Sequence, residues 1–263
     1  MTAKRRTEDF TLQFGSLPRE IPLQGTALVE VECLRQGYAG PVRLRAEPRI
    51  DGVEVRCGDV PAGQTKGYLT FTGAATGTFR ALEISVTGVS ITTEPTIERR
   101  AVGSVFLASE QGTPASPLVI THWVTAVASR PLLALHAESD SIEVPIGHSA
   151  SFRLVVDHRE GEATAAEIQI DAISLPAGVV AGEAKISARE NVGSIELKAA
   201  PTASPGEGAG VVRARILTQG GPPSVFPLPL FRVRLVSASE TPPSPASAAG
   251  STSTGANRSP IAR

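Results

Sequence analysis

The segment EIPLQGTALVEVECLRQGYAGPVRLRA, residues 20–46, decides the fold because its pattern occurs twice in the chain. Its counterpart, residues 143–172, reads EVPIGHSASFRLVVDHREGEATAAEIQIDA. Each copy begins with Glu-apolar-Pro-apolar, reaches a glycine, runs through one alternating segment, turns, and continues into a second. Because self-similarity of this kind marks one structural unit used more than once, the chain is predicted to hold two copies of one domain, each of about a hundred residues.

Apolar and polar residues alternate in both copies, as in strands that have one buried and one wet face. Val42 and Leu44, for example, alternate with Arg43 and Arg45. No window of 11 residues shows a helical period, and turns rich in Gly and Pro separate the segments, which predicts an all-β chain of two antiparallel β-sandwiches. The same alternation occurs at residues 82–86, 152–156, 168–172, 212–216 and 231–235.

Composition along the chain predicts three parts. The first sandwich covers residues 8–129, and Pro131 ends its last strand, which places the domain junction at residues 129–131. The second sandwich covers residues 131–238. Residues 239–263 are rich in Pro, Ala, Ser and Thr and are expected to form a flexible tail, because they contain too little apolar surface to offset the entropy of ordering. Residues 89–111 have almost no counterpart in the second copy and are predicted to add a hairpin at a sheet edge.

Charge and hydropathy exclude several classes of protein. The 25 basic and 26 acidic residues nearly cancel, which argues against a strongly basic protein that binds nucleic acid. No stretch approaches 18 consecutive apolar residues, so no membrane insertion is expected. No apolar segment follows Lys4, Arg5 and Arg6, so the chain as given carries no export signal. We therefore expect either a cytoplasmic protein or a piece of a longer exported polypeptide.

Two cysteines, Cys33 and Cys57, share the parity of core residues in their predicted strands, and both are expected to point inward. A disulfide requires Cα atoms within about 7 Å. If a third strand lies between the two cysteine strands, the separation is roughly 9–10 Å. Two buried free thiols are then favoured over a disulfide, and both alternatives stay open at this point.

Motifs that carry chemistry are weak in this chain. The GHSAS segment nearly matches the nucleophile elbow G-x-S-x-G, but its last position is Ser151, and a strand follows instead of a helix. The four histidines are not at metal-ligand spacing, and no D-x-D-x-D-G loop supports Glu138 and Asp140 as calcium ligands near the junction. The sequence predicts no catalytic residue, no cofactor and no metal site.

Three side chains are candidates for contact with a ligand. Tyr38 lies in a turn, where its ring can be exposed, and His122 beside Trp123 is the only pair of a histidine and an aromatic residue. Tyr38, Tyr68 and Trp123 are all the Tyr and Trp residues of the chain. Because they are widely separated, they make a poor platform for stacking on sugars.

The order of these signals resembles the immunoglobulin-like repeats of large, multi-domain exported proteins of planctomycetes and related bacteria. The resemblance is carried by the turn RQGYAGP at residues 35–41, the VPAG turn at residues 60–63 and the Gly-bounded strand at residues 67–72. It covers most of both copies. It implies two tandem immunoglobulin-like sandwiches that serve as spacers or accessory modules, and it supplies no catalytic residues.

The function expected from the sequence is therefore a non-enzymatic structural or interaction module of a bacterial exported or envelope-associated protein. Its expected partners are other domains of a larger polypeptide. The alternative is a binding module for a polysaccharide or a protein, which would act through an edge strand or through the hairpin at residues 89–111.

Overall fold

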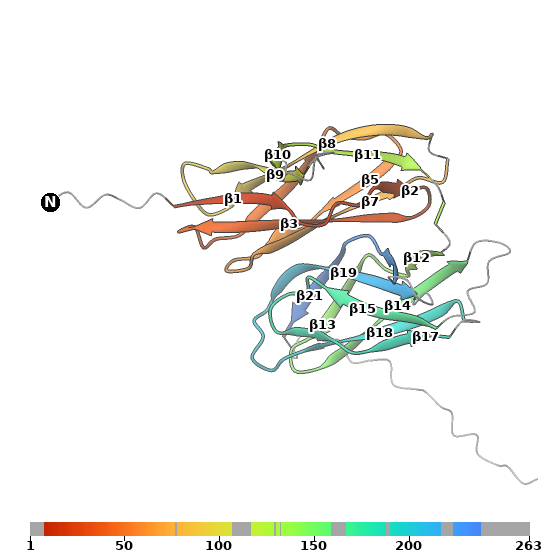
Figure 1. Cartoon of the computed structure of the whole chain (residues 1–263). Helices are drawn as coiled ribbons and strands as arrows, with labels where there is room; N and C mark the ends of the chain where they lie inside the picture. Colours follow the sequence, from red (N-terminus) through yellow and green to blue (C-terminus); the bar gives the residue numbers. More distant parts are fainter. Residues whose placement is uncertain are drawn as a thin grey trace, which may run out of the picture.

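The computed structural model describes residues 8–76, 78–106, 117–128, 130–131, 133–158, 167–187, 190–216 and 223–237. Every regular element in these ranges is a β-strand, so the all-β prediction is confirmed. Over the same ranges, no helix is long and apolar enough to cross a membrane. The strands form two sandwiches that lie side by side, domain 1 above domain 2 in Figure 1. The predicted tail lies outside the described residues.

Domain 1 is built from two antiparallel layers joined at one side. One layer has the order β1-β3-β7-β5 and the other β2-β11-β8-β4-β6, in which β2 runs parallel to β11. Strand β9 pairs with β8, then with β1, and finally with β10, so it connects the layers into one continuous sheet. The strands are β1 (Asp9–Phe14), β2 (Glu20–Pro22), β3 (Thr26–Gln36), β4 (Val42–Glu47), β5 (Val53–Cys57), β6 (Asp59–Val60), β7 (Lys66–Gly73), β8 (Arg80–Ser90), β9 (Glu98–Phe106), β10 (Pro117–Ile120) and β11 (Trp123–Ala128).

Domain 2 repeats this strand order with one difference. Its layers are β12-β14-β18-β16 and β13-β21-β19-β15-β17, and β20 pairs with β19. No ladder between described residues joins the two layers. The strands are β12 (Leu133–Ala137), β13 (Ser141–Pro145), β14 (Ser149–His158), β15 (Ile168–Ile173), β16 (Val179–Ala181), β17 (Ala184–Ile186), β18 (Val192–Ala199), β19 (Gly206–Ile216), β20 (Ser224–Pro227) and β21 (Phe231–Val236).

The registers of the two domains match residue for residue, which confirms the tandem repeat. Glu20 lies opposite Ala126 of β11, and Glu143 occupies the same place opposite Arg234 of β21. The pairs on the middle strand of the second layer, β8 in domain 1 and β19 in domain 2, agree as well. In domain 1, Ile84 lies opposite Trp123 and Ser90 opposite Val42. In domain 2, Gly210 lies opposite Phe231 and Ile216 opposite Ile168 at the same positions. Both domains are therefore immunoglobulin-like sandwiches of one topology.

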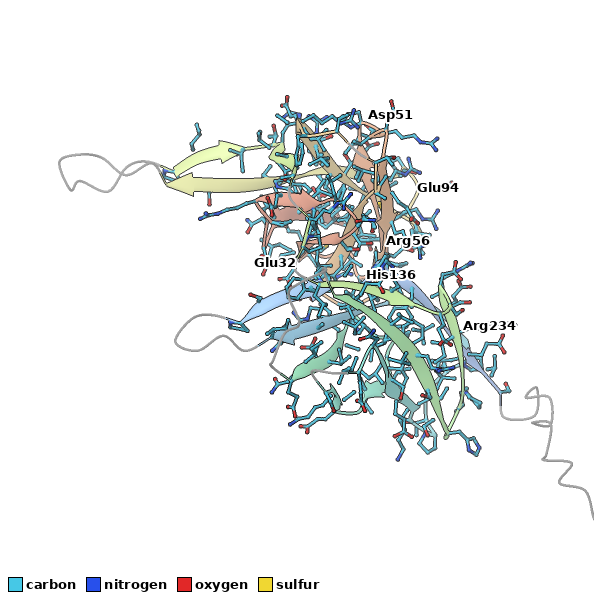
Figure 2. All side chains as sticks on the ribbon, turned by 90° about the vertical axis from the view of Figure 1, so that its right-hand side faces the viewer. Glu32, Asp51, Arg56, Glu94, His136 and Arg234 are labelled. Atoms are coloured by element: carbon cyan, nitrogen blue, oxygen red, sulfur yellow. The ribbon has the colours of Figure 1, made fainter. Side chains whose placement is uncertain are left out.

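The predicted edge hairpin at residues 89–111 needs correction. Val89 and Ser90 belong to β8, and β9 lies between β8 and β1 rather than at a sheet edge. The hairpin that extends beyond the layers is formed by β9 and β10, and in Figure 2 it projects from domain 1 on the left. Residues 107–111 lie outside the described residues. The second copy has a counterpart of β9, the shorter strand β20.

Each sandwich has its own apolar core, because the inward residues of its facing layers alternate with outward polar ones. In β3, for example, Val29, Val31 and Cys33 are buried while the residues between them are half-buried. The largest buried side chains of domain 1 are Phe10, Leu12, Ile21, Tyr38, Leu44, Leu69, Phe71 and Ile84, and those of domain 2 are Leu133, Leu154, Ile168 and Ile186.

Candidate interaction surfaces

The contact between the two domains centres on Leu230, in the segment between β20 and β21. Its N–H donates to the hydroxyl oxygen of Thr70 on β7 at 3.0 Å, in a buried position. Its carbonyl oxygen accepts a hydrogen bond from Arg56 Nη1 at 2.9 Å. Figure 2 shows Arg56 where domain 1 faces domain 2. Both polar backbone groups of one residue in domain 2 are thus bound by side chains of domain 1.

Apolar side chains surround these hydrogen bonds. Tyr68, Val211 and Leu230 form a small buried cluster that is separate from both cores. It explains why β7 is buried on both faces: Leu69 and Phe71 point into the core of domain 1, while Tyr68 and Thr70 face domain 2. Partly buried Leu28, Ile173 and Ala209 pack against the cluster.

Charged groups border this interface. Burial raises the pKa of the Tyr68 phenol, and the negative charge of Glu30 raises it further. Lys66 Nζ donates to Glu30 Oε1 at 2.7 Å, and this bond raises the pKa of the Lys66 ammonium. Glu30, Tyr68 and Arg213 line a pocket of about 310 Å³ between the domains. Charged side chains therefore lie beside the apolar cluster at this pocket.

Asp171 on β15 fixes two arginines of β19. Arg213 makes a bidentate ion pair with it, with Nε 2.9 Å from Oδ1 and Nη2 2.7 Å from Oδ2. Arg215 Nη2 lies 2.7 Å from the same Oδ2. Arg215 Nε is buried without a hydrogen-bond partner. Both carboxylate oxygens of Asp171 are thus bound by arginines of the neighbouring strand, and Arg213 also lines the pocket between the domains.

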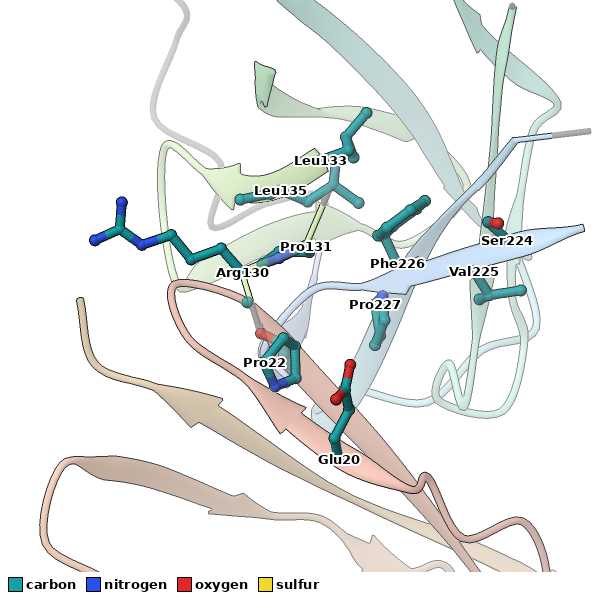
Figure 3. Close-up of a pocket in the computed structure, with 13 residues that line it drawn as sticks. Glu20, Pro22, Arg130, Pro131, Leu133, Leu135, Ser224, Val225, Phe226 and Pro227 are labelled. Carbon is teal, nitrogen blue, oxygen red and sulfur yellow. The ribbon is translucent and has the colours of Figure 1, made fainter. Parts of the chain in front are cut away.

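A second cavity, of about 610 Å³, lies at the junction of the two domains. It is bounded by β12 and β20 of domain 2 and by β2 and the start of β3 of domain 1 (Figure 3). Its walls are mainly apolar, with Glu20 and Arg130 as the charged residues among those that line it. In Figure 3, Arg130 extends away from Glu20, so the two charges do not converge.

Tyr38 does not offer its ring to a ligand, which corrects the expectation from its place in a turn. It is only 2% exposed and packs in the core against Phe10, with ring centroids 5.6 Å apart. Its hydroxyl donates to the carbonyl of Pro41 at 2.6 Å and accepts from the N–H of Ile91 at 3.3 Å. Arg35 stacks on the ring and donates to the carbonyls of Gln64 and Pro61, both at 2.7 Å. Tyr38 and Arg35 therefore hold the neighbouring turns together.

The pair of His122 and Trp123 is split between surface and core. Trp123 is 2% exposed, packs edge-on against Phe71 at 5.1 Å, and donates its indole N–H to the carbonyl of Pro18 at 2.9 Å. His122 is half-buried, with Nδ1 3.3 Å from Glu83 Oε1. The ring of Trp123 is therefore not available as a stacking platform, and the half-buried His122 is the member of this pair that reaches the surface.

The two cysteines are not bonded to each other. Cys33 on β3 is buried, and burial raises the pKa of its thiol. Strand β7 lies between β3 and β5, as the geometric argument against a disulfide required. The expectation that both point inward is wrong for Cys57, which is exposed. It is the last residue of β5, beyond the edge of the core.

The acidic residues near the junction are paired with cations. Glu138 Oε1 lies 3.3 Å from Arg153 Nη1, and Asp140 Oδ2 lies 3.9 Å from Arg232 Nη2. Within the described part of the chain, no three His, Cys, Asp or Glu side chains are arranged so that they could hold a metal ion.

Sequence reasoning missed the residues that make the interface. Thr70 and Leu230 lie in different copies, and no motif links them. Thr70 belongs to the Gly-bounded strand at residues 67–72, a signal that points to no contact with the other copy. The signal that could have found them is the composition of β7, in which Tyr68 and Leu69 are consecutive large residues inside an alternating strand. Such a run predicts a strand that is buried on both faces.

A scan against models of known protein families gives no match, and a search of curated protein sequences gives none either. A search of solved structures gives matches, of which three follow. The D00–D0 domains of Intimin have 12% sequence identity over 87% of this chain and 100% of that one, with a TM-score of 0.28. Domains 5–6 of the S-layer protein SbsC have 12% identity over 88% of this chain and 100% of that one, with a TM-score of 0.28. A conjugative transposon lipoprotein from Bacteroides eggerthii has 13% identity and a TM-score of 0.27, and it covers 35% of this chain and 91% of its own.

Proposed function

We propose that the chain is a non-enzymatic structural and interaction module whose two immunoglobulin-like sandwiches act as one rigid unit. The observation that supports this proposal is the binding of Leu230 from both sides, by Thr70 and by Arg56. Hydrogen bonds to both backbone groups of one buried residue hold the two domains together at this point. The apolar cluster around Tyr68 adds buried surface, which makes separation costly.

The arrangement of ionisable groups supports a role other than catalysis. General acid–base chemistry needs titratable side chains that converge on a cavity. Here the acids and bases form ion pairs along the strands, as Asp171 does with Arg213 and Arg215. The larger cavity has mainly apolar walls, and among the described residues that line it, the charges of Glu20 and Arg130 do not converge.

Rigidity is tested by the tumbling of the chain in solution. If the domains form one body, NMR relaxation of amides in β3 of domain 1 and in β18 of domain 2 gives one common rotational correlation time. Two clearly different correlation times would show that the domains reorient independently, and the proposal of a rigid module would then be wrong.

We further propose that this module belongs to a bacterial exported or envelope-associated protein, where it spaces or presents neighbouring domains. The support is the resemblance carried by the turn and strand signals of both repeats. A blot of fractionated native cells tests it. A band well above 27.3 kDa in the envelope or the medium is expected. A band of that mass in the cytoplasm would contradict export and would direct attention to an intracellular partner.

A second candidate function is binding of a protein partner at the hairpin of β9 and β10. Leu118 is 53% exposed and Val119 is 65% exposed on β10, a strand whose one ladder among the described residues is with β9. An exposed apolar edge strand is a template for pairing with another chain. The buried rings of Tyr38 and Trp123 favour a protein over a polysaccharide here.

Two variants test this role in a pull-down of the partner. Val119→Lys should abolish binding of the partner, whereas the control variant Val124→Lys, at an exposed valine of β11, should still bind it. Equal binding by both variants would contradict this role.

A further inference from the structure

The two domains differ at one lateral seam between their layers. We define this seam as the gap between β1 and β9 in domain 1, and between the corresponding strands β12 and β20 in domain 2. In domain 1, β9 closes this seam by pairing in parallel with β1, with Leu12 opposite Ala101 and Gln13 opposite Val102. Arg99 Nη2 supports the closure through an ion pair with Asp9 Oδ2 at 2.7 Å. The backbone of β1 is therefore paired on both sides.

In domain 2 the same seam is open. Strand β12 pairs with β14 and strand β20 pairs with β19, but no ladder between described residues joins β12 to β20. The sequence of β20 explains the difference. Arg100 of β9 lies opposite Thr87, and Pro227 of β20 occupies the same place opposite Arg213.

The residues that follow these positions decide whether the seam closes. Ala101 and Val102, which pair with β1, correspond to Leu228 and Pro229. Proline has no N–H to donate to a ladder. The N–H of Leu228 donates instead to the carbonyl of Val212 at 2.8 Å. Two prolines and this hydrogen bond keep the segment on its own layer.

The free edge of β12 presents backbone groups to the seam. The N–H of Glu138, just beyond β12, donates to the carbonyl of Arg153 on β14 at 3.4 Å. Residues of an antiparallel edge strand alternate between pointing toward the partner and pointing away from it. The N–H and C=O groups of Leu133, Leu135 and Ala137 therefore point away from β14. The corresponding edge of β1 in domain 1 is the one on which Leu12 pairs with β9.

The cavity of about 610 Å³ lies at this open seam. Its volume falls within the roughly 300–1,000 Å³ of typical binding sites. Figure 3 shows Leu133 and Leu135 of β12 on one side and Phe226 and Pro227 of β20 on the other. Val225, beside them, is 45% exposed. Apolar walls next to unpaired strand edges suit a segment of extended chain better than a polar small molecule.

We propose that the seam of domain 2 accepts an extended peptide strand from another polypeptide. The strand pairs its backbone with the free edge of β12 and places apolar side chains in the cavity. The occupant is inferred from the other copy, where the same seam holds β9, with the small apolar residues Ala101, Val102 and Gly103. The acceptor therefore selects a proline-free segment with small apolar residues. This goes beyond the role of a rigid spacer, which does not require an open seam.

The test uses the whole chain and a synthetic peptide of the β9 sequence, ERRAVGSVF, labelled with a fluorophore. Fluorescence anisotropy measures binding, and NMR hydrogen exchange locates it. We expect saturable binding and slower exchange of the amides of Leu133 and Leu135, by about tenfold or more. A peptide that carries Val102→Pro should bind about tenfold more weakly, because proline interrupts the ladder.

Two protein variants provide matched controls. Val225→Lys places a charge in the wall of the cavity and should weaken binding about tenfold or more. Val180→Lys changes another exposed valine, on β16, far from β12 in strand order, and should leave the affinity unchanged.

Three results would overturn the proposal. The first is no binding at about 1 mM peptide, and the second is equal binding by the Val225→Lys and Val180→Lys variants. The third is protection of the Leu135 amide without peptide that increases with protein concentration, which would assign the seam to a second copy of this chain. If one of these results is found while both domains still share one correlation time, the peptide proposal is wrong but the proposal of a rigid module stands.

Discussion

At the scale of single residues, Tyr38 has a measurable role in stability. Tyr38→Phe removes the hydroxyl that donates to Pro41 and accepts from the N–H of Ile91, which keeps the carbonyl of Pro41 as an acceptor at 3.3 Å. We expect a loss of about 0.5–1.5 kcal/mol in the free energy of unfolding. Guanidinium denaturation measures it. Phe79→Leu, at an exposed aromatic residue, should change stability by less than about 0.5 kcal/mol; equal effects of the two variants would contradict a structural role for the Tyr38 hydroxyl.

The two thiols should differ in reactivity. Alkylation needs access and a thiolate. Burial raises the pKa of both thiols, so the difference between them comes from access, which buried Cys33 lacks. Mass spectrometry after brief alkylation of the folded chain should find the label on exposed Cys57 well before Cys33. In denaturant both should react. Rapid labelling of Cys33 in the native chain would contradict its place in the core.

These two residues also show where parity arguments lose force. Alternation predicted the inward direction of Cys33 correctly, because it lies within a long strand that is paired on both sides. Cys57 has the same parity as Val53, but it ends a short strand where the core ends, so its side chain meets solvent. A turn position alone likewise could not show that Tyr38 folds back into the core, because that contact involves Phe10 and Ile91, which are distant in sequence.

At the scale of elements, the closure of domain 1 limits the size of residue 88. A Cβ atom on Gly88 of β8 would lie 2.5 Å from Leu12 Cδ1 and 2.7 Å from Val42 Cγ1. Gly88→Ala should therefore cost about 1–3 kcal/mol of unfolding free energy through overpacking. Gly206→Ala, on the matching strand β19, meets no atom within 4 Å and is the control. Calorimetry or chemical denaturation would contradict the packing argument if both variants were equally stable.

The ion pair between β1 and β9 should make the closure of domain 1 depend on pH. The Arg99 guanidinium hydrogen-bonds Asp9 and holds the pKa of that carboxyl below its usual value of 3.8, against the opposing effect of burial. A lowered folded pKa means that this stabilisation is present above pH 3.8 and is lost as the pH falls through the folded pKa. Asp9→Asn should reduce the difference in stability between pH 5 and pH 3. Solvent screening keeps the effect small, since both side chains are partly exposed.

Sequence pattern predicted most elements of both sandwiches because one face of most strands is wet. It described β9 incorrectly, because a strand that crosses from one layer to the other pairs with different neighbours along its length and carries no single period. The open seam of domain 2 was readable in principle. The prolines at positions 227 and 229 stand where the first copy has Arg100 and Val102, but the alignment that shows this comes from the ladder register.

At the scale of the whole molecule, the run of Tyr68 and Leu69 could mark β7 as buried on both faces, but the contact made by Thr70 was beyond sequence reasoning for a physical reason. Thr70 is polar and alternates with Leu69 and Phe71, so its pattern is that of an ordinary wet face. Only the presence of a second sandwich, with the N–H of Leu230 directed at the hydroxyl, turns this face into buried surface. Two domains that each satisfy the alternation rule can therefore still be one mechanical unit.

Coupling between the domains can be measured because Trp123, in domain 1, is the only tryptophan. Its fluorescence reports domain 1 alone, while far-UV circular dichroism reports both sandwiches. In the natural chain the two signals should change at the same denaturant concentration, as one cooperative unit does. Thr70→Val keeps the shape of the side chain but leaves the buried N–H of Leu230 without its acceptor, which should cost about 1–3 kcal/mol and separate the two transitions. Thr65→Val, at an exposed threonine, should leave them coincident. If the two signals already separate in the natural chain, the domains unfold independently and the interface does not couple them.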